Sequence, residues 1–334
     1  MQRIVFCCLG VFFLQCHTPT PWVKNQKIGN AFGTTYSIIY LSDSPIDYQR
    51  EIDSVVNAVN RSMSTYLPDS DISKINQGDS TLIVDKMFRD VFAISTKVNK
   101  VSNGYFDPTV GVLANAWGFG PGEQQELDSI KVDSLLRYVG WQKVSLDAQG
   151  RVKKKHAAIR FDFNAVAKGY AIDRLGAMLD QKGIVHYLVE VGGEILAKGQ
   201  NKVKNKQWTV GVDNPNDVLV RGAAAVLNLE NAALASSGNY RKFRYDSETG
   251  EKYVHTIDPL TGYTKNAKVL AATVIAENCA TADAYATAIM AMDLEMSKEV
   301  LGNDNNLDAF IIYLDKDDVM ETFMTAGFQE RLVE

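Results

Sequence analysis

Two oxygen-bearing side chains, Asp283 and Thr287, are the first candidates for chemistry in this sequence. A helix is predicted from Thr281, and a spacing of four residues places both side chains on one partly apolar face. A carboxylate is costly to bury there unless it is paired or bound to a metal, and together with a hydroxyl it offers hard oxygen ligands for Mg²⁺. The first turn of a helix also favours phosphate. The plainer alternative, an acid near a helix start and a surface hydroxyl, stays open.

A lysine in an unfavourable position gives a second candidate. Residues 162–170 are predicted as a strand end that runs into a helix, with Lys168 in the first helical turn. Because the helix dipole disfavours a cation at that end, Lys168 is explained if an anion such as a pyrophosphate lies against it. A solvated lysine on a capped helix is the alternative interpretation.

Of the four histidines, His255 has the most suggestive setting. It lies at the predicted end of a strand, just before a tight turn at 258–259, where functional groups are often displayed. A histidine there can remove a proton from a hydroxyl nucleophile near neutral pH; a hydrogen-bonded structural histidine is the competing interpretation. Tyr66 suits either stacking on a planar ring or core packing, and its pattern favours the core. The segment 105–109 is a weaker candidate for a ring-stacking loop.

The elements that must position these residues are helices and strands in mixed order, without a linker or an internal repeat. Several strands follow one another with no helix between them, which favours an α+β fold over a doubly wound sheet. We therefore predict a single large domain with a mixed, largely antiparallel sheet and packed helices. The predicted helices begin near Ser44, Asp85, Ala165 and Thr281, and the predicted strands are 31–41, 187–191, 208–212, 224–229, 254–257, 269–276 and 309–314.

The N-terminal residues predict the compartment. Arg3 precedes an apolar stretch over residues 4–14, which is typical of a secretory signal peptide and too short for a membrane span of about 20 residues. Cys16 stands where a bacterial lipoprotein signal carries its acylated cysteine, and simple cleavage or an uncleaved anchor are the alternatives. We expect a lipoprotein of the cell envelope, anchored to a membrane on the periplasmic side. The predicted divisions are a signal peptide (1–15), a lipid-anchored tether (16–27) and a catalytic domain (28–334).

Composition excludes several classes of function. The formal net charge is −5, with acidic and basic residues interspersed, so no nucleic-acid-binding surface is indicated. Once residues 1–16 are removed or acylated, Cys279 is the one remaining thiol, which excludes a disulfide framework and a cysteine-based zinc site. The glycines of 118–122 follow no predicted strand, and Pro121 would interrupt a helix, so a dinucleotide-binding loop is rejected. Small molecules and proteins are the favoured partners.

Taken in order, a series of short segments resembles the ApbE-type FAD:protein FMN transferases. One such segment would mean little, but the ordered set is specific and runs through nearly all of the chain after the signal. The segments are Phe32–Tyr36, Met63–Tyr66, Phe106–Gly111, Asn115–Gly120, Asp162–Ala165, Lys168–Ala171, Val191–Glu194, Ser236–Arg241, His255–Pro259 and Ala282–Ala284.

The resemblance implies Mg²⁺-dependent transfer of FMN from FAD to a threonine hydroxyl of an acceptor protein, with release of AMP. It implies that Asp283, Thr287 and the backbone carbonyl of Ala165 hold Mg²⁺ against the FAD pyrophosphate, where the metal stabilises charge on the leaving AMP. Asp283 and His255 would be the catalytic residues, with His255 assisting the attacking threonine. The residues implied to line the flavin and adenine pockets are Phe32, Tyr66, Tyr105, Phe106, Asp107, Asp162, Lys168, His255, Thr256 and Ile257.

The chain departs from the family's usual pattern at Phe32, where methionine is common, and at Thr256, where an aliphatic residue is common. It holds no copy of the family's short threonine-containing flavinylation motif. The expected acceptor is therefore a separate envelope protein, such as a redox-driven pump subunit or a flavin-carrying reductase. Two other functions remain as alternatives: an FAD pyrophosphatase, in which water replaces threonine, and a non-enzymatic FAD-binding lipoprotein.

Overall fold

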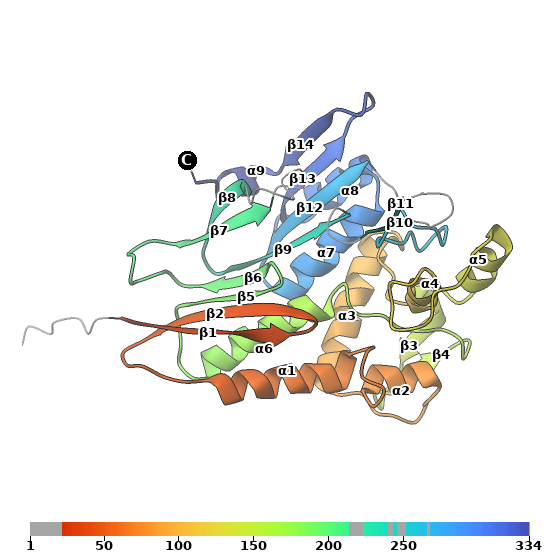
Figure 1. Ribbon diagram of the computed structural model, residues 1–334, viewed down its shortest axis with the longest axis horizontal. Helices are drawn as coiled ribbons and strands as arrows, with labels where there is room; N and C mark the ends of the chain where they lie inside the picture. The colour runs from red at the N-terminus through yellow and green to blue at the C-terminus, as the bar shows by residue number, and fades with distance from the viewer. Residues whose placement is uncertain (1–21, 214–222, 240–242, 246–251, 266–267, 334) are drawn as a thin grey trace, which may run out of the picture.

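An eight-stranded sheet, antiparallel at every pairing, organises the computed structural model (Figure 1). The structure describes residues 22–213, 223–239, 243–245, 252–265 and 268–333. In spatial order the strands are β1 (Val23–Ala31), β2 (Thr34–Ser42), β5 (Tyr187–Val191), β6 (Glu194–Lys198), β9 (Ala232–Gly238), β12 (Val269–Ala276), β13 (Asp308–Leu314) and β14 (Met320–Met324). Three hairpins complete the set: β3 (Val144–Leu146) with β4 (Val152–Lys154), β7 (Trp208–Asp213) with β8 (Ala223–Leu229), and β10 (Phe243–Tyr245) with β11 (Lys252–Val254).

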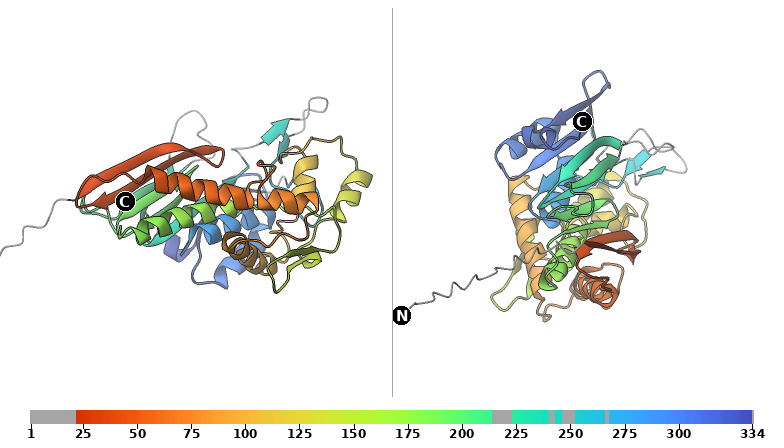
Figure 2. Two further views of the ribbon diagram at one scale, coloured as in Figure 1. Left: turned by 90° about the horizontal axis from the view of Figure 1, so that it is seen from below. Right: turned by 90° about the vertical axis from the view of Figure 1, so that its left-hand side faces the viewer.

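Helices cover one face of the large sheet, as the views of Figure 2 show. α6 (Ala167–Gln181) packs on β5 and β6, and α7 (Cys279–Ala291) packs on β9 and β12. The two helices also pack against each other, with α1 (Gln49–Met63) on α6 and α3 (Lys86–Val101) on α7. The remaining helices are α2 (Asp71–Gln77), α4 (Gly111–Ala116), α5 (Ser129–Leu136), η1 (Trp141–Lys143), α8 (Leu294–Gly302) and α9 (Ala326–Gln329).

The opposite face of the sheet packs on the β7–β8 hairpin and on α9. An apolar cluster joins them through Trp208 and Leu227 of the hairpin, Phe310 of β13 and Phe328 of α9. The side chains of β12 alternate between the two faces, with Ala272 and Val274 in the cluster on the helical side and Ala271 and Ile275 in the cluster with the hairpin, as the period of two in a strand requires. The sheet is therefore the middle of three layers.

α7 is the most enclosed helix of the site region, with 11 of its 13 residues buried. Its residues are apolar on all sides, which is typical of a helix surrounded by protein. Alanine at every second position from 280 to 288 keeps the helix thin enough for α6, α3 and the sheet to approach it. Asp283 is a carboxylate within this largely apolar helix, so neighbouring groups must compensate its charge.

The predicted fold class is confirmed, and most predicted strands are present, but several boundaries were wrong. Of the predicted strand 254–257 only Val254 belongs to a strand, β11. The predicted strand from Ala31 begins at the last residue of β1 and runs across the turn to β2, where Phe32 and Gly33 have φ of 52° and 75°. The helix predicted from Ser44 begins at Gln49, and the Ser44 hydroxyl donates to Asp43 instead of capping it. The long helix predicted from 281 to 296 ends at Ala291, because Asp293 caps the separate helix α8.

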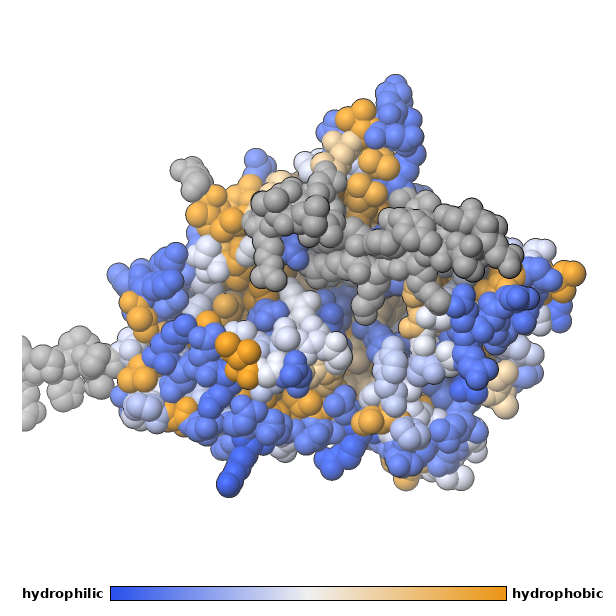
Figure 3. All heavy atoms as spheres, viewed as in Figure 1, coloured by the Kyte–Doolittle hydropathy of each residue, from blue (hydrophilic) through white to orange (hydrophobic). Residues whose placement is uncertain are grey.

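The sheet has two edges, and β14 forms one of them. Figure 3 shows apolar surface at the top of the view, over this part of the molecule. Val319, just before β14, and Met320, its first residue, are 54% and 42% exposed. The adjacent turn, 315–318, carries four charged residues. Charges beside an edge strand oppose its pairing with another chain.

No helix within the described ranges is both long and apolar enough to cross a membrane. The predicted signal peptide, and Cys16 in the predicted tether, lie outside the described residues. Of the tether, Val23–Lys27 belongs to β1.

Candidate active site

Asp283 lies where α7 crosses the start of α6. Its residue is 5% exposed, and Oδ2 accepts a hydrogen bond from the backbone N–H of Gly169 at 3.0 Å. Burial raises the pKa of the Asp283 carboxyl, against the opposing effects of the Lys168 charge and the Gly169 N–H. Asp283 is therefore not a solvent-facing acid at a helix start.

Lys168, in the first turn of α6, forms an ion pair with the buried Glu194 of β6. Nζ lies 2.7 Å from Oε2 of Glu194, and the two side chains are 28% and 4% exposed. Burial acts to lower the pKa of Lys168, but the charges of Glu194 and Asp283 outweigh it, so the pKa is raised. Lys168 is thus held by carboxylates and is not a freely solvated lysine.

When ionised, the side chains of Lys168, Glu194 and Asp283 together carry one negative charge in excess. Burial raises the pKa of Glu194 to about 7, the Lys168 charge opposes this shift, and the Asp283 charge adds to it. Two carboxylates with a single ammonium are costly to enclose in protein. A cation beside Asp283 would balance the cluster, so the charges present fit a bound metal ion.

The hydroxyl and carbonyl predicted to complete the metal site lie on the elements around Asp283. Oγ1 of Thr287, one turn along α7, lies 3.4 Å from the hydroxyl of Ser237 on β9, and its residue is partly buried. The N–H of Gly169, four residues after Ala165, donates to Asp283 and not back to the Ala165 carbonyl. Within the described ranges no three His, Cys, Asp or Glu side chains gather into a metal site. The predicted set is of another kind, since it holds one carboxylate, one hydroxyl and one carbonyl.

The first turn of α7 is not available to a phosphate, so that prediction was wrong. The N–H groups of Cys279 and Ala280 donate to the two oxygens of Asp173 on α6, at 2.7 and 2.9 Å. The N–H of Thr281 donates to the side chain of Asn278 at 2.9 Å. A helix N-terminus attracts anions through its unpaired N–H groups, and here protein acceptors already occupy them.

Tyr66 and Asp162 line one cavity of about 220 Å³, together with Asn76, Asn115 and Arg160. Tyr66 is 61% exposed, so the core packing that its sequence pattern favours is wrong. Burial raises the pKa of Asp162, whose carboxylate accepts the N–H of Asn164 at 2.8 Å. Sites for drug-sized ligands are usually about 300–1,000 Å³, so this cavity suits one portion of a dinucleotide.

The segment 105–107 has a more structural setting than its predicted role suggests. The Asp107 carboxylate accepts the N–H and hydroxyl of Thr109 at 2.8 and 2.6 Å and the N–H of Trp141 at 2.7 Å. Phe106 is 2% exposed in the main core. The ring of Tyr105 is partly exposed and lies 4.7 Å from Nζ of Lys265. Tyr105 is therefore the member of this segment whose ring can meet a ligand.

The His255–Ile257 segment lies beside the strand end that contacts Thr287. The Thr256 hydroxyl donates to the Asn239 side chain at 2.8 Å, and Asn239 follows β9 two residues after Ser237. Two residues along a strand span about 7 Å, so the His255–Ile257 segment and Thr287 both lie at the C-terminal end of β9. His255 itself is partly buried, directly after β11. Phe32 lies in the β1–β2 turn, partly buried against the two clusters of the helical layer.

Two acids of this region, the buried Glu194 and the partly buried Asp173, were missed as site residues. Glu194 follows the turn Gly192-Gly193, whose φ values of 61° and 100° reverse the chain before β6. Burial raises the pKa of Asp173 to about 7, against the effect of its two N–H partners. The available signal was an acid flanked by apolar residues, in Ala171–Leu175 and in Val191–Leu196. Roles for the predicted site residues stay predictions.

Comparison with known proteins identifies the family of this chain. The ApbE family model matches residues 32–311. The chain is 34% identical over 325 residues to an FAD:protein FMN transferase of Haemophilus influenzae, covering 93% of this chain and 92% of that protein. It is 32% identical to the FAD:protein FMN transferase of Vibrio cholerae, covering 94% of each.

Solved structures show the same fold. The flavin transferase ApbE from Vibrio cholerae superposes with a TM-score of 0.82 at 30% identity, over 93% of this chain and 100% of that one. The apo form of the Pseudomonas stutzeri flavinyl transferase ApbE gives 0.81 at 27% identity, over 93% and 97%. On these grounds the chain belongs to the ApbE family and is an enzyme, a flavin transferase.

Proposed function

We propose that this enzyme transfers the FMN half of FAD to a threonine hydroxyl of a separate acceptor protein, with Mg²⁺ as the cation and AMP as the second product. The P–O bond between the two phosphates of FAD breaks, and a phosphoester bond forms between the FMN phosphorus and the threonine oxygen. The threonine loses its proton, and AMP leaves with the bridging oxygen. Supporting this function, the curated relatives in Haemophilus and Vibrio are FAD:protein FMN transferases.

The observation that carries the proposal is the buried carboxylate of Asp283, one turn before Thr287 and beside Lys168. Asp283, Thr287 and the Ala165 carbonyl would hold Mg²⁺, which neutralises the pyrophosphate and the charge that develops on AMP. Lys168 would add a second positive charge toward the phosphates. Its pairing with Glu194 keeps it protonated and fixes its direction until FAD binds.

His255 would accept the proton of the threonine that attacks. Its place after β11, next to the Thr256–Asn239 hydrogen bond, supports this role because that bond ties the segment to the end of β9. Tyr66, Asp162 and Tyr105 would contact the rings of FAD. The acceptor is expected in the cell envelope, together with a lipid-anchored form of this chain.

The test uses purified enzyme, FAD, Mg²⁺ and envelope extract from the source cell. Transfer leaves flavin fluorescence on an acceptor band after denaturing electrophoresis, and AMP appears in the same amount. Asp283→Asn keeps the shape of the side chain but removes its charge, and AMP release should fall by more than about 100-fold, beyond the usual loss for residues that only support ligands. Normal turnover by this variant, or full turnover in EDTA, would refute the metal assignment.

The same assay separates the two alternative functions. AMP release with all flavin left free indicates an FAD pyrophosphatase. Tight FAD binding without AMP at any Mg²⁺ concentration indicates a binding protein. Thr287→Ser, which keeps the hydroxyl, serves as the matched control for Thr287→Val, which has nearly the same shape without the hydroxyl.

A further inference from the structure

The crossing of α6 and α7 is held by two acids, each of which binds the other helix. Asp173 of α6 accepts the N–H groups of Cys279 and Ala280, the first two residues of α7. Asp283 of α7 accepts the N–H of Gly169, the third residue of α6. Each carboxylate therefore caps a helix to which it does not belong, and this satisfies first-turn donors that a helix cannot pair internally.

The two helices touch at the backbone where these bonds form. A Cβ atom built on Gly169 would collide with the carbonyl oxygen of Cys279, and it would lie 2.7 Å from that carbonyl carbon and 2.9 Å from Cα of Ala280. Only glycine permits this approach. Because the contact is between backbones, any shift of α7 relative to α6 moves the Gly169 N–H relative to Asp283.

Both carboxylate oxygens of Asp173 are engaged by α7. Oδ1 is bound by the N–H of Cys279 and Oδ2 by the N–H of Ala280. The opposing charge at the start of α7 also balances the helix dipole there. The role of Asp173 is therefore directed at α7, on which Asp283 lies one turn further along.

We propose that Asp173 is a positioning residue for Asp283: its two hydrogen bonds fix the rotation and height of α7 on α6, and so the position of the Asp283 carboxylate. The inference rests on the proposed function, in which Asp283 binds the divalent cation. It predicts that loss of these bonds weakens Mg²⁺ binding while the chemical step survives.

The test compares Asp173→Asn with Asp293→Asn as the matched control. Asparagine at 173 keeps the shape, but its NH₂ group cannot accept the second N–H. Asp293 is likewise a helix-capping acid, accepting the N–H of Met296 at 2.8 Å, but it caps α8. The readout is the Mg²⁺ concentration for half-maximal AMP release at saturating FAD, together with the maximal rate at high Mg²⁺.

The half-saturating Mg²⁺ concentration should rise at least about tenfold in Asp173→Asn, as when residues that orient metal ligands are changed. High Mg²⁺ should restore most of the rate. The control should stay within about twofold of wild type, as surface changes usually do. An equal Mg²⁺ dependence in the two variants, or a lower maximal rate with no Mg²⁺ shift, would overturn the inference.

A second readout needs neither metal nor turnover. Amide hydrogen exchange of the metal-free protein should be faster at Gly169 in Asp173→Asn, although Asp173 does not bind that amide, and unchanged there in Asp293→Asn. An unchanged Gly169 amide in Asp173→Asn contradicts the coupling. If that variant does not fold, the wild-type amides of Gly169, Cys279 and Ala280 should still show one common free energy of opening, and widely different values contradict the coupling. Wild-type turnover in EDTA would instead refute the proposed metal role and leave the exchange result standing.

Discussion

Glu194 is the residue on which the charge state of Lys168 depends. The pair is enclosed, with Oε2 and Nζ 2.7 Å apart and side chains 4% and 28% exposed. Removing one partner of a buried pair leaves the other charge without compensation, which costs far more than the pair itself contributes. The stability of the free enzyme should therefore be sensitive at this position.

Glu194→Gln should lower the free energy of unfolding by about 1.5 kcal/mol at pH 8, because it replaces the charge-assisted hydrogen bond to Nζ of Lys168 by a neutral one and leaves Asp283 as the nearby counter-charge. The pH lies above the raised pKa of Glu194, about 7, so the wild-type carboxyl is ionised. Urea unfolding followed by circular dichroism measures the difference. The control is Glu295→Gln, since Glu295 pairs with Lys298 but its side chain is 83% exposed. That change should cost less than about 0.5 kcal/mol, and equal losses would contradict the role of Glu194.

Much of the chemistry at residue scale could be predicted from the sequence. The four-residue spacing of Asp283 and Thr287 and the unfavourable place of Lys168 are local signals. For Glu194 and Asp173 the local signal is only an acid among apolar residues, because their partners lie elsewhere along the chain: Lys168 for Glu194, and Cys279 and Ala280 for Asp173. The helix dipole argument for α7 failed for the same reason, since the group that occupies its N–H donors comes from another helix.

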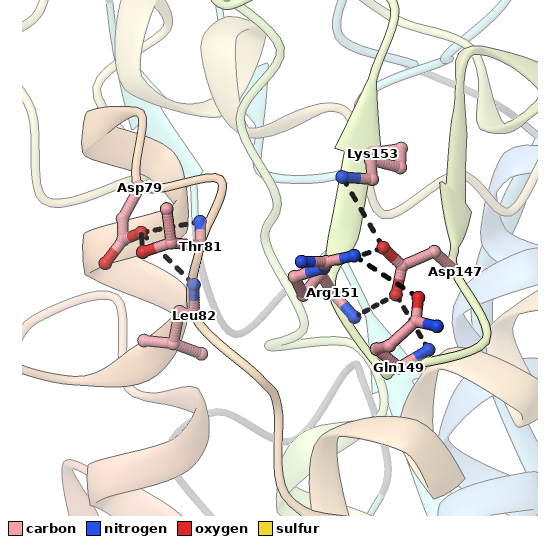
Figure 4. Close-up of polar contacts among 7 residues, drawn as sticks. All are labelled: Asp79, Thr81, Leu82, Asp147, Gln149, Arg151 and Lys153. Carbon is pink, nitrogen blue, oxygen red and sulfur yellow. Dashed lines mark hydrogen bonds and ion pairs between the residues drawn. The ribbon is translucent and has the colours of Figure 1, made fainter.

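At the scale of elements, the β3–β4 hairpin shows how a single acid organises a turn (Figure 4). Oδ1 of Asp147 accepts the N–H groups of Gln149 and Arg151 at 3.0 and 2.8 Å, and Oδ2 accepts Nε of Arg151 at 2.8 Å. These bonds, the backbone N–H of Arg151 above all, lower the pKa of Asp147 from 3.8 to about 2. Ionised Asp147 is therefore the form that the folded hairpin favours.

Asp147→Asn should lower stability at neutral pH, because asparagine can keep the bonds to one oxygen only. The folded pKa is lowered, so the stabilisation is complete above about pH 4 and is lost as the pH falls toward 2. The gap between wild type and variant in thermal unfolding should thus shrink over that range. A constant gap would show that the charge is not the cause.

Asp79→Asn is the matched control, because all the bonds of Asp79 shown in Figure 4 go to one oxygen. Oδ1 accepts the N–H and hydroxyl of Thr81 at 2.8 Å each and the N–H of Leu82 at 3.2 Å. Asparagine retains such an oxygen. The control should be less destabilised at neutral pH than Asp147→Asn.

At the scale of the whole molecule, the sequence predicts the class of fold but not the strand order. Successive strands without helices between them favour antiparallel pairing, which is confirmed. The order, however, brings β2 beside β5 and β6 beside β9, pairings between residues far apart in the chain. The sequence marks β9 only weakly, because its residues Ala232–Gly238 are small apart from Leu234 and none is β-branched or aromatic, as residues that mark strands are.

The predicted lipid anchor at Cys16 also concerns the whole chain, and it can be tested directly. Cys16→Ser should move the protein from the membrane fraction to the soluble fraction, because acylation at this position is the expected anchor. Turnover of FAD by the soluble protein should equal that of wild type, since the domain that carries Asp283 is unaltered. Membrane association that persists in this variant would indicate an uncleaved N-terminal segment instead.

The contact between Gly169 and Cys279 has a consequence for observing the enzyme. The thiol of Cys279 is completely enclosed, and burial raises its pKa well above the ordinary value. A thiolate-seeking reagent can reach it only when α7 lifts from α6 or the whole chain unfolds. The rate at which Cys279 is labelled, followed by peptide mapping, therefore reports how often the two helices separate. A lower labelling rate with FAD and Mg²⁺ present would show that the ligands keep the helices together.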